Sequence, residues 1–230
     1  GSGVFAWAAD TPQHIAYADI VGQAIRAGQW PWWTYYLGTG SPFLQFYGFL
    51  FFLLAGATSV ILPTATALKL CLGVLHALSG GGICALLRAT GRRRTAALLG
   101  GLAYVLCFWH TQQVLIMGRF PLALVYALLP WALAGFERAV GGTTVRWRWA
   151  LTGGCALGGV LLTHPGYGLW SCVFVLLYMF LRLGPWRQLR FQRGGKAWRR
   201  WLPSAALLGA GTTIGMALVL PMWIDRHATG

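Results

Sequence analysis

The chain of 230 residues is 57% hydrophobic and only 10% charged, with a mean hydropathy of +0.60. Charged residues make up roughly 25% of an average soluble domain, so this composition excludes a soluble globular protein and predicts an integral membrane protein. The formal charge of +14 would suit nucleic-acid binding, but lysine and arginine also accumulate in the cytoplasmic loops of membrane proteins. The positions of the charges decide between these two explanations.

The first segment, residues 10–48, holds two of the four acidic residues, Asp10 and Asp19, together with His14. Apolar residues at helical spacing predict a short amphipathic helix over 11–28, with a proline suited to its first turn and a glycine suited to its end. Asp10 and His14 are four residues apart, on one face if the helix begins that early. This pair fits a general base or a metal ligand; the alternative is helix capping by Asp10 with a solvated His14.

The aromatic run Trp30–Tyr36 follows this helix and is typical of side chains at a membrane–water interface. Residues 43–62 are apolar enough for a spanning helix, but two glycines and Pro63 shorten it, so an interfacial or re-entrant helix is the alternative. We expect residues 1–63 to form an external loop with juxtamembrane helices. Residues 64–230 are expected to form a bundle of about six spanning helices, with the chain truncated at both ends.

Six spanning helices are predicted from length and hydropathy, at about residues 65–88, 95–113, 120–137, 149–164, 166–183 and 203–222. Of the 18 basic residues, four, three and seven fall in the first, third and fifth connections between these helices, and therefore on one face. The positive-inside rule makes that face cytoplasmic, so no nucleic-acid partner is needed. At its edge, Glu137-Arg138 is most simply explained as a local surface pair. Gly80–Gly82 and Gly153-Gly154 are expected to allow close helix packing.

The opposite face then collects three of the four acidic residues and four of the five histidines. Asp10, His14 and Asp19 lie in the opening segment, and the others lie in three further polar corners. His110 to Arg119 forms one; an arginine on a sparsely basic face fits a phosphate or carboxylate partner, unless it snorkels beside headgroups. His164 forms the second, facing a cavity or a partner or satisfying a backbone carbonyl at a tight turn. Asp225 to His227 forms the third corner; the alternative is that these residues are only a hydrophilic juxtamembrane segment that ends the last spanning helix.

Short motifs occur along the chain, in the opening segment and in later connections. They are Asp10-x-x-x-His14, Arg26-x-Gly28-x-x-Pro31 with Trp33, Gly38, Gly40-Ser-Pro42, Phe46-Tyr47, Gly118-Arg-Phe-Pro121, Leu129-Pro130, Leu162-Thr-His-Pro165 and Leu220-Pro221. These motifs look like the first external loop and later connections of bacterial GT-C-type membrane proteins labelled 6-pyruvoyl-tetrahydropterin synthase-related, which are similar to the YfhO-like group.

The resemblance implies an all-α, polytopic transmembrane helix bundle of GT-C-like fold, with juxtamembrane helices in its first external loop. It also implies an enzyme in the bacterial inner membrane that moves a sugar from a polyprenyl-phosphate donor to a glycan, lipid or protein acceptor outside the cytoplasm. Asp10 and His14 would then be catalytic. Residues expected to bind the substrate or the lipid phosphate are Arg119, His164, His110, Trp33 and Tyr36.

The sequence leaves metal use and a competing function open. The paired acids usual in such enzymes are not evident, which leaves Asp10 and Asp225 as the only candidate ligands for Mg or Mn and no certain cofactor. The alternative function is a non-enzymatic transporter or flippase for lipid-linked glycans, or a scaffold in envelope assembly. Transporters place charged residues in mid-membrane and show repeats with broken helices. No clear repeat is present here, and the polar residues are expected at one surface, which favours the transferase.

Overall fold

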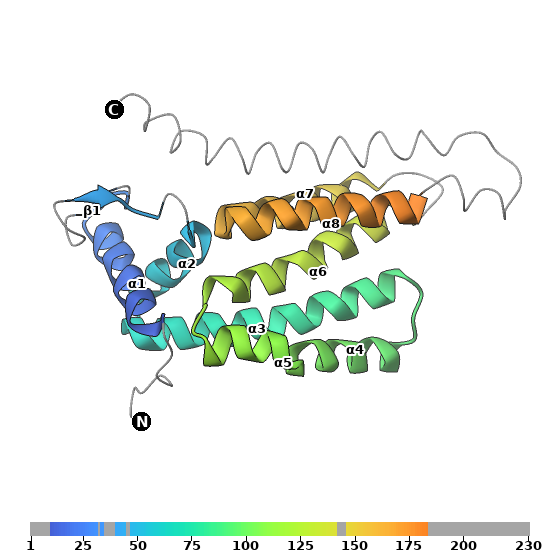
Figure 1. Ribbon diagram of the computed structural model, residues 1–230, viewed down its shortest axis with the longest axis horizontal. Coiled ribbons are helices and arrows are strands. Elements are labelled where there is room, and N and C mark those ends of the chain that lie inside the picture. Colours follow the sequence, from blue (N-terminus) through green and yellow to red (C-terminus); the bar gives the residue numbers. More distant parts are fainter. Residues whose placement is uncertain (1–9, 32, 35–39, 45–46, 142–145, 184–230) are drawn as a thin grey trace, which may run out of the picture.

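The computed structural model describes residues 10–31, 33–34, 40–44, 47–141 and 146–183. Within these residues the chain folds into eight α-helices, one π-helical turn and a two-stranded ribbon. Three helices are long and apolar enough to cross a membrane: α3 (Thr64–Ala89), α6 (Pro121–Val140) and α8 (Pro165–Leu183). The predicted class, an all-helical membrane bundle, is confirmed (Figure 1).

The N-terminal helices lie together at one end of the bundle (Figure 1). Helix α1 (Thr11–Arg26) has a proline in its first turn, and Gly28, with φ +67°, follows its end, as the sequence predicted. Helix α2 (Phe49–Ser59) has 11 residues, about 16 Å at about 1.5 Å per residue. Since the hydrocarbon core is about 30 Å thick, α2 is too short to cross it, which favours the interfacial alternative for 43–62.

A small antiparallel ribbon lies beside α1 and was not anticipated from the sequence. It pairs β1 (Trp33–Thr34) with β2 (Ser41–Pro42), with Trp33 opposite Pro42. A Cβ added at Gly40, where φ is +113°, would lie 2.7 Å from the indole nitrogen of Trp33. The ribbon thus requires glycine at this position, both for its backbone angle and for the close approach of the indole.

The predicted span 95–113 is not one helix, which corrects the sequence prediction. Helix α4 (Arg94–Leu106) ends at Cys107, whose extended ψ of 141° breaks it, and α5 (Phe108–Thr111) and the π-helical turn η1 (Gln112–Ile116) follow. In a continuous helix with about 3.6 residues per turn, His110 would point away from the packed face of α4 at Gly101, towards lipid. The break turns His110 inward, where it is buried.

The remaining helices pack closely through small residues. Helix α6 packs against both α3 and α7 (Trp147–Thr163), and α7 packs against α8. A Cβ added at Gly135 of α6 would lie 2.7 Å from the backbone nitrogen of Gly153 in α7, so the predicted packing role of Gly153 is confirmed. The predicted span 203–222 lies outside the described residues, and the division at residue 63 stays a prediction.

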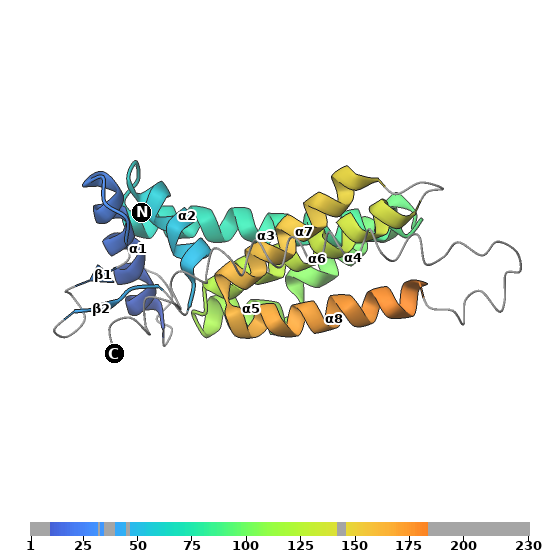
Figure 2. The ribbon, with the colours of Figure 1, turned by 90° about the horizontal axis from the view of Figure 1, so that it is seen from above.

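One end of the bundle, opposite α1, α2 and the ribbon, is rich in arginine. The connection from α3 to α4, the ends of α6 and α8 and the start of α7 all lie at this far end (Figures 1 and 2). They carry the arginines that the sequence placed on one face: Arg88, Arg92, Arg93, Arg94, Arg138, Arg146, Arg148 and Arg182.

Candidate functional site

His14 fixes α1 to the loop that precedes α6. The imidazole is 2% exposed, and its Nδ1 lies 2.7 Å from the carbonyl oxygen of Gly118. Because a carbonyl only accepts, Nδ1 carries the proton and donates it. The ring packs between Phe52 and Phe120, each 5.3 Å away between centroids. Gly118 has φ +70°, a conformation open to glycine, so the loop's path and the histidine contact depend on each other.

Tyr47 lies at the centre of this end of the bundle. Its ring stacks on His14 at 6.0 Å and meets His164 edge-on at 5.1 Å. Burial is the main cause that raises the pKa of Tyr47 to about 12; the charge of Asp10 raises it further, and the charge of Arg119 lowers it. The phenol therefore stays a neutral hydroxyl at physiological pH.

His164 connects α7 and α8 to the N-terminal helices. The amide of Gly48, which precedes α2, donates to the carbonyl of Thr163 at 2.7 Å, and this brings the end of α7 beside the start of α2. The amide of Tyr167 donates to Nδ1 of His164 at 3.3 Å. Nδ1 is therefore unprotonated, and the proton of the neutral ring is on Nε2, where it is available as a donor.

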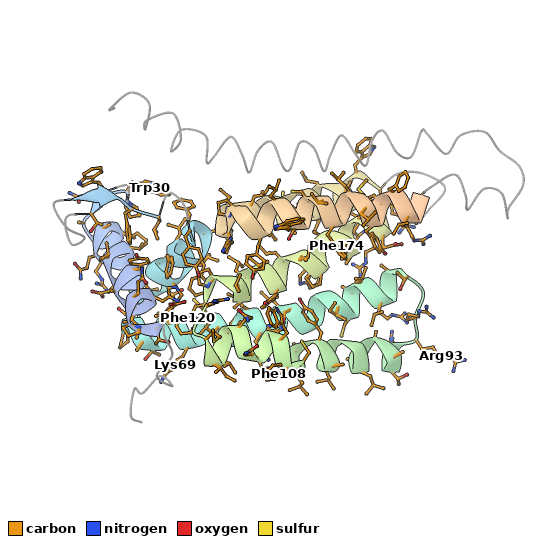
Figure 3. All side chains as sticks on the ribbon, in the orientation of Figure 1. Trp30, Lys69, Arg93, Phe108, Phe120 and Phe174 are labelled. Carbon is orange, nitrogen blue, oxygen red and sulfur yellow. The ribbon has the colours of Figure 1, made fainter. Side chains whose placement is uncertain are left out.

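Arg119 is held by a buried amide from the π-helical turn. Its Nη1 donates to Oε1 of Gln113 at 2.8 Å, and its backbone amide donates to the carbonyl of the same residue at 3.0 Å. Gln113 is 3% exposed. The sequence placed the two residues in one polar corner, and these contacts confirm that they are neighbours. Figure 3 shows the adjacent Phe120 at the end of α6 that faces α1.

The structure thus places His14 and His164 in ring contact with Tyr47, a residue that belongs to one of the sequence motifs but was not among the predicted site residues. His14 links the two charged residues to this cluster, because its amide donates to the carbonyl of Asp10 and its ring binds Gly118, which directly precedes Arg119. Asp10 precedes α1 and is partly buried, and its side chain makes no capping hydrogen bond. The side chain of Asp10 therefore does not cap α1, which was the alternative explanation for this acid. The signal that would have found Tyr47 is a polar aromatic residue directly before Gly48.

Two other site residues were predicted in the aromatic run, and the structure describes one of them. Trp33 is 52% exposed in β1, at the outer side of this end, and Tyr36 lies outside the described residues. Asp19 has a structural role: its carboxylate accepts hydrogen bonds from Thr64 at 2.9 Å and from Gln23 at 2.6 Å, which ties α1 to the start of α3.

His110 belongs to a different cluster, which corrects its expected place in the outer corner. Its ring lies 4.9 Å from that of His76, near the middle of α3, and it also contacts Tyr104 and Tyr126. Neither ring nitrogen of His110 makes a hydrogen bond to another described residue, and the same holds for the hydroxyl of Tyr126. Polar groups thus lie in mid-bundle as well as at its end.

Glu137 is not part of a local surface pair, which corrects a second expectation. Its carboxylate is 1% exposed and accepts hydrogen bonds from Nε of Arg182 at 2.7 Å and from the hydroxyl of Tyr178 at 2.6 Å. Its sequence neighbour Arg138 stacks 4.3 Å over Trp149 instead. A carboxylate buried in a bundle needs a partner for its charge, and α8 supplies the half-buried Arg182 from 45 residues further along the chain.

No three histidine, cysteine or acidic side chains group together as metal ligands within the described residues. Asp225, the second candidate ligand, lies outside them. Asp10 is therefore the single carboxylate that the described chain offers at this end, because Asp19 is occupied by Thr64 and Gln23.

Comparison with known proteins identifies the family. A family model described as the 6-pyruvoyl-tetrahydropterin synthase related domain, a membrane protein, matches residues 44–193, more than half of the chain. The match includes Tyr47, Arg119 and His164 and begins after Asp10 and His14. Searches of curated proteins and of solved structures each returned no match. With three helices of membrane-spanning length, the chain is an integral membrane protein and belongs to the 6-pyruvoyl-tetrahydropterin synthase related family.

Proposed function

We propose that this protein is a GT-C-type membrane glycosyltransferase, which transfers a sugar from a polyprenyl-phosphate-linked donor to an acceptor on the external face of the bacterial inner membrane. The observation that carries the proposal is the gathering of an acid, an arginine and a histidine at the end of the bundle where the half-buried Tyr47 contacts His14 and His164. These groups come from the segment before α1 and from three connections of the chain, and they combine a base with donors suited to a phosphate leaving group.

Each polar group has a distinct role in this chemistry. The carboxylate of Asp10 accepts the proton of the acceptor hydroxyl. That oxygen forms a bond to the anomeric carbon of the sugar as the bond between this carbon and the phosphate oxygen breaks, and the electron pair leaves with the polyprenyl phosphate. The guanidinium of Arg119 stabilises the departing phosphate, since its planar fork matches phosphate oxygens. His164 donates from Nε2 to the same group.

His14 acts as a positioning residue in this scheme. A side chain that is 2% exposed does not contact the sugar. Its hydrogen bond to Gly118 instead fixes the residue next to Arg119, and its ring supports Tyr47. The aromatic run acts at the outer surface, where Trp33, half-exposed on the ribbon, and Tyr36 seat the loop at the interface and stack on the sugar. No step in this scheme uses a metal.

The first prediction concerns Asp10 directly. In the full-length protein, Asp10→Asn removes the base while conserving the size of the side chain, and a lost general base typically lowers the rate by about 100-fold to 10,000-fold. Sugar transfer is measured in membranes from a polyprenyl-linked donor, at matched protein levels. The control is Asp19→Asn, the same change within the helix that Asp10 precedes, at a carboxylate engaged in structural hydrogen bonds. Undiminished transfer by Asp10→Asn would remove this residue from the mechanism.

The second candidate function, transport of lipid-linked glycans, is favoured by a specific observation. His76, His110 and Tyr126 form a polar cluster in mid-bundle beside a π-helical turn. Intramembrane ionisable groups are typical of transport pathways, and π-helical turns are frequent at functional sites. The test measures whether the wild-type protein moves a lipid-linked sugar across the membrane of vesicles without cleaving the sugar–phosphate bond. Such movement, lost in His110→Phe, would favour the transporter over the transferase.

A further inference from the structure

A second site lies at the arginine-rich end, opposite the Asp10 site. A pocket of about 410 Å³ opens where α3 and α6 end and α7 begins. This volume falls within the range of about 300–1,000 Å³ typical of ligand sites. Its lining is formed by Arg88, Ala89, Glu137, Arg138, Gly141, Arg146 and Trp149.

The pocket carries a positive charge that the described protein does not neutralise. Its one acid, Glu137, is already paired with Arg182 of α8, and no other carboxylate forms an ion pair within the described residues. Three arginines therefore remain: Arg88, Arg138 and Arg146. The C-terminal dipoles of α3 and α6 oppose an anion here, but each is worth only about half a charge, against three full charges and the N-terminal dipole of α7.

Two of these arginines and the pocket wall are held in place by the surrounding chain. The guanidinium of Arg138 lies 4.3 Å over the ring of Trp149, a cation–π contact. Arg88 donates from Nη1 to the carbonyl of Arg92 at 2.7 Å. The amide of Arg146 donates to the carbonyl of Ala139 at 3.1 Å, which closes the connection from α6 to α7 beside the pocket. Such preorganisation lowers the entropic cost of binding an anion.

We infer that this pocket binds a phosphate group, carried by an anionic phospholipid headgroup or by a soluble phosphate compound. Arginine forks match phosphate oxygens in geometry as well as charge, and basic pockets between transmembrane helices bind anionic headgroups. The site shares no residue with the proposed transferase site, so it stands whether or not that proposal is correct.

The test compares two phosphate probes on the full-length protein. Wild type and Arg138→Gln/Arg146→Gln are purified in detergent, and binding is measured from thermal stabilisation by phosphatidylglycerol and by inorganic phosphate, with phosphatidylcholine as the zwitterionic reference. Removal of two phosphate-binding arginines is expected to weaken binding about tenfold or more. Stabilisation by phosphatidylglycerol alone assigns the phosphate to a lipid headgroup, and stabilisation by inorganic phosphate assigns it to a soluble compound.

The control variant is Arg93→Gln. Arg93 is exposed at the same end of the bundle (Figure 3) but does not line the pocket, so this change alters the net charge without altering the site. Arg146→Gln alone, at an exposed side chain, guards against a folding defect in the double variant. Equal binding by pocket variants and wild type would overturn the inference, and so would an equal loss in Arg93→Gln or no response of wild type to either probe.

Discussion

The hydrogen bond from His14 to the carbonyl of Gly118 joins residues 104 positions apart and aligns two parts of the candidate site. Burial among Phe52, Phe120 and Tyr47 disfavours the charged imidazole. Burial lowers the pKa of His14 below 6.5 and outweighs both the Gly118 bond and the charge of Asp10, which act to raise it. The folded protein therefore stabilises the neutral ring.

This lowered pKa predicts acid-dependent loss of stability. Between the folded pKa of His14 and the unfolded value of 6.5, the unfolded chain binds more protons, so the free energy of unfolding falls as the pH falls through this window. The slope from one such group is at most about 1.4 kcal/mol per pH unit. Above pH 6.5 this contribution is fully present. Unfolding temperatures of the purified protein, measured from neutral to mildly acidic pH, should decrease accordingly.

The matched variant for this measurement is His14→Asn. Asparagine retains an N–H donor near the position of Nδ1 for Gly118 and does not titrate. The unfolding temperature of the variant should therefore fall less than that of the wild type over the same pH range. The two proteins share all their other histidines, so the difference between them reports on His14. Identical pH dependence of variant and wild type would show that His14 is not the group responsible.

At the scale of the elements, small residues determine how closely α6 and α7 approach. A Cβ at Gly135 would lie 2.8 Å from both the Cα of Gly153 and the carbonyl oxygen of Trp149. These are backbone atoms, which cannot rotate away as a flexible side chain does. Even the single methyl group of alanine at Gly135 would therefore push α6 and α7 apart.

We predict that Gly135→Ala destabilises the protein by about 1–3 kcal/mol, the usual cost of overpacking. The control is Gly73→Ala in α3, where an added Cβ meets nothing within 4 Å. That change should be neutral, or stabilising by about 0.5–1 kcal/mol, because alanine loses less backbone entropy in a helix. Unfolding temperatures in detergent measure both effects. A Gly135→Ala protein as stable as Gly73→Ala would contradict the packing argument.

A helix could be predicted from the sequence where a single local signal, such as apolar length, proline or glycine, sets its first and last residues. Apolar length alone located α3, and a proline and a glycine located both ends of α1. The break at Cys107 could not be predicted, because it depends on the tertiary burial of His110 rather than on local propensity. For the same reason the partner of Glu137 was missed: Arg182 is remote in sequence, and periodicity gives no information about which helices pack together.

At the scale of the whole molecule, the candidate site was predictable as a set of polar corners, since acids and histidines are scarce enough in this chain to be conspicuous. Three of the predicted polar segments contain Asp10, Arg119 and His164, which do converge. The centre of the cluster was not predictable: Tyr47 is one of eight tyrosines, and its importance comes from contacts with His14 and His164 that only the packing of α2 on α1 and α7 creates.

The division of basic residues between the two ends of the bundle predicts how the molecule is oriented in the membrane. Of the basic residues in the described chain, eight lie at the arginine-rich end, and three lie towards the other: Arg26, Lys69 and Arg119. Because positively charged residues are retained in the cytoplasm, we predict that the arginine-rich end is cytoplasmic and that the Asp10 site faces outside. The phosphate pocket would then face the cytoplasmic leaflet, whose anionic lipids attract basic clusters.

Cysteine accessibility tests this orientation. In a background without the five native cysteines, Gln29→Cys, exposed after α1, should react with a membrane-impermeant maleimide in intact cells. Arg93→Cys, exposed before α4, should react only after the membrane is permeabilised. Both positions are in water in either orientation, so labelling of each after permeabilisation is the internal control. The reverse pattern would place Asp10 in the cytoplasm, where an acceptor on the external face is out of reach, and the transferase proposal would fail with it.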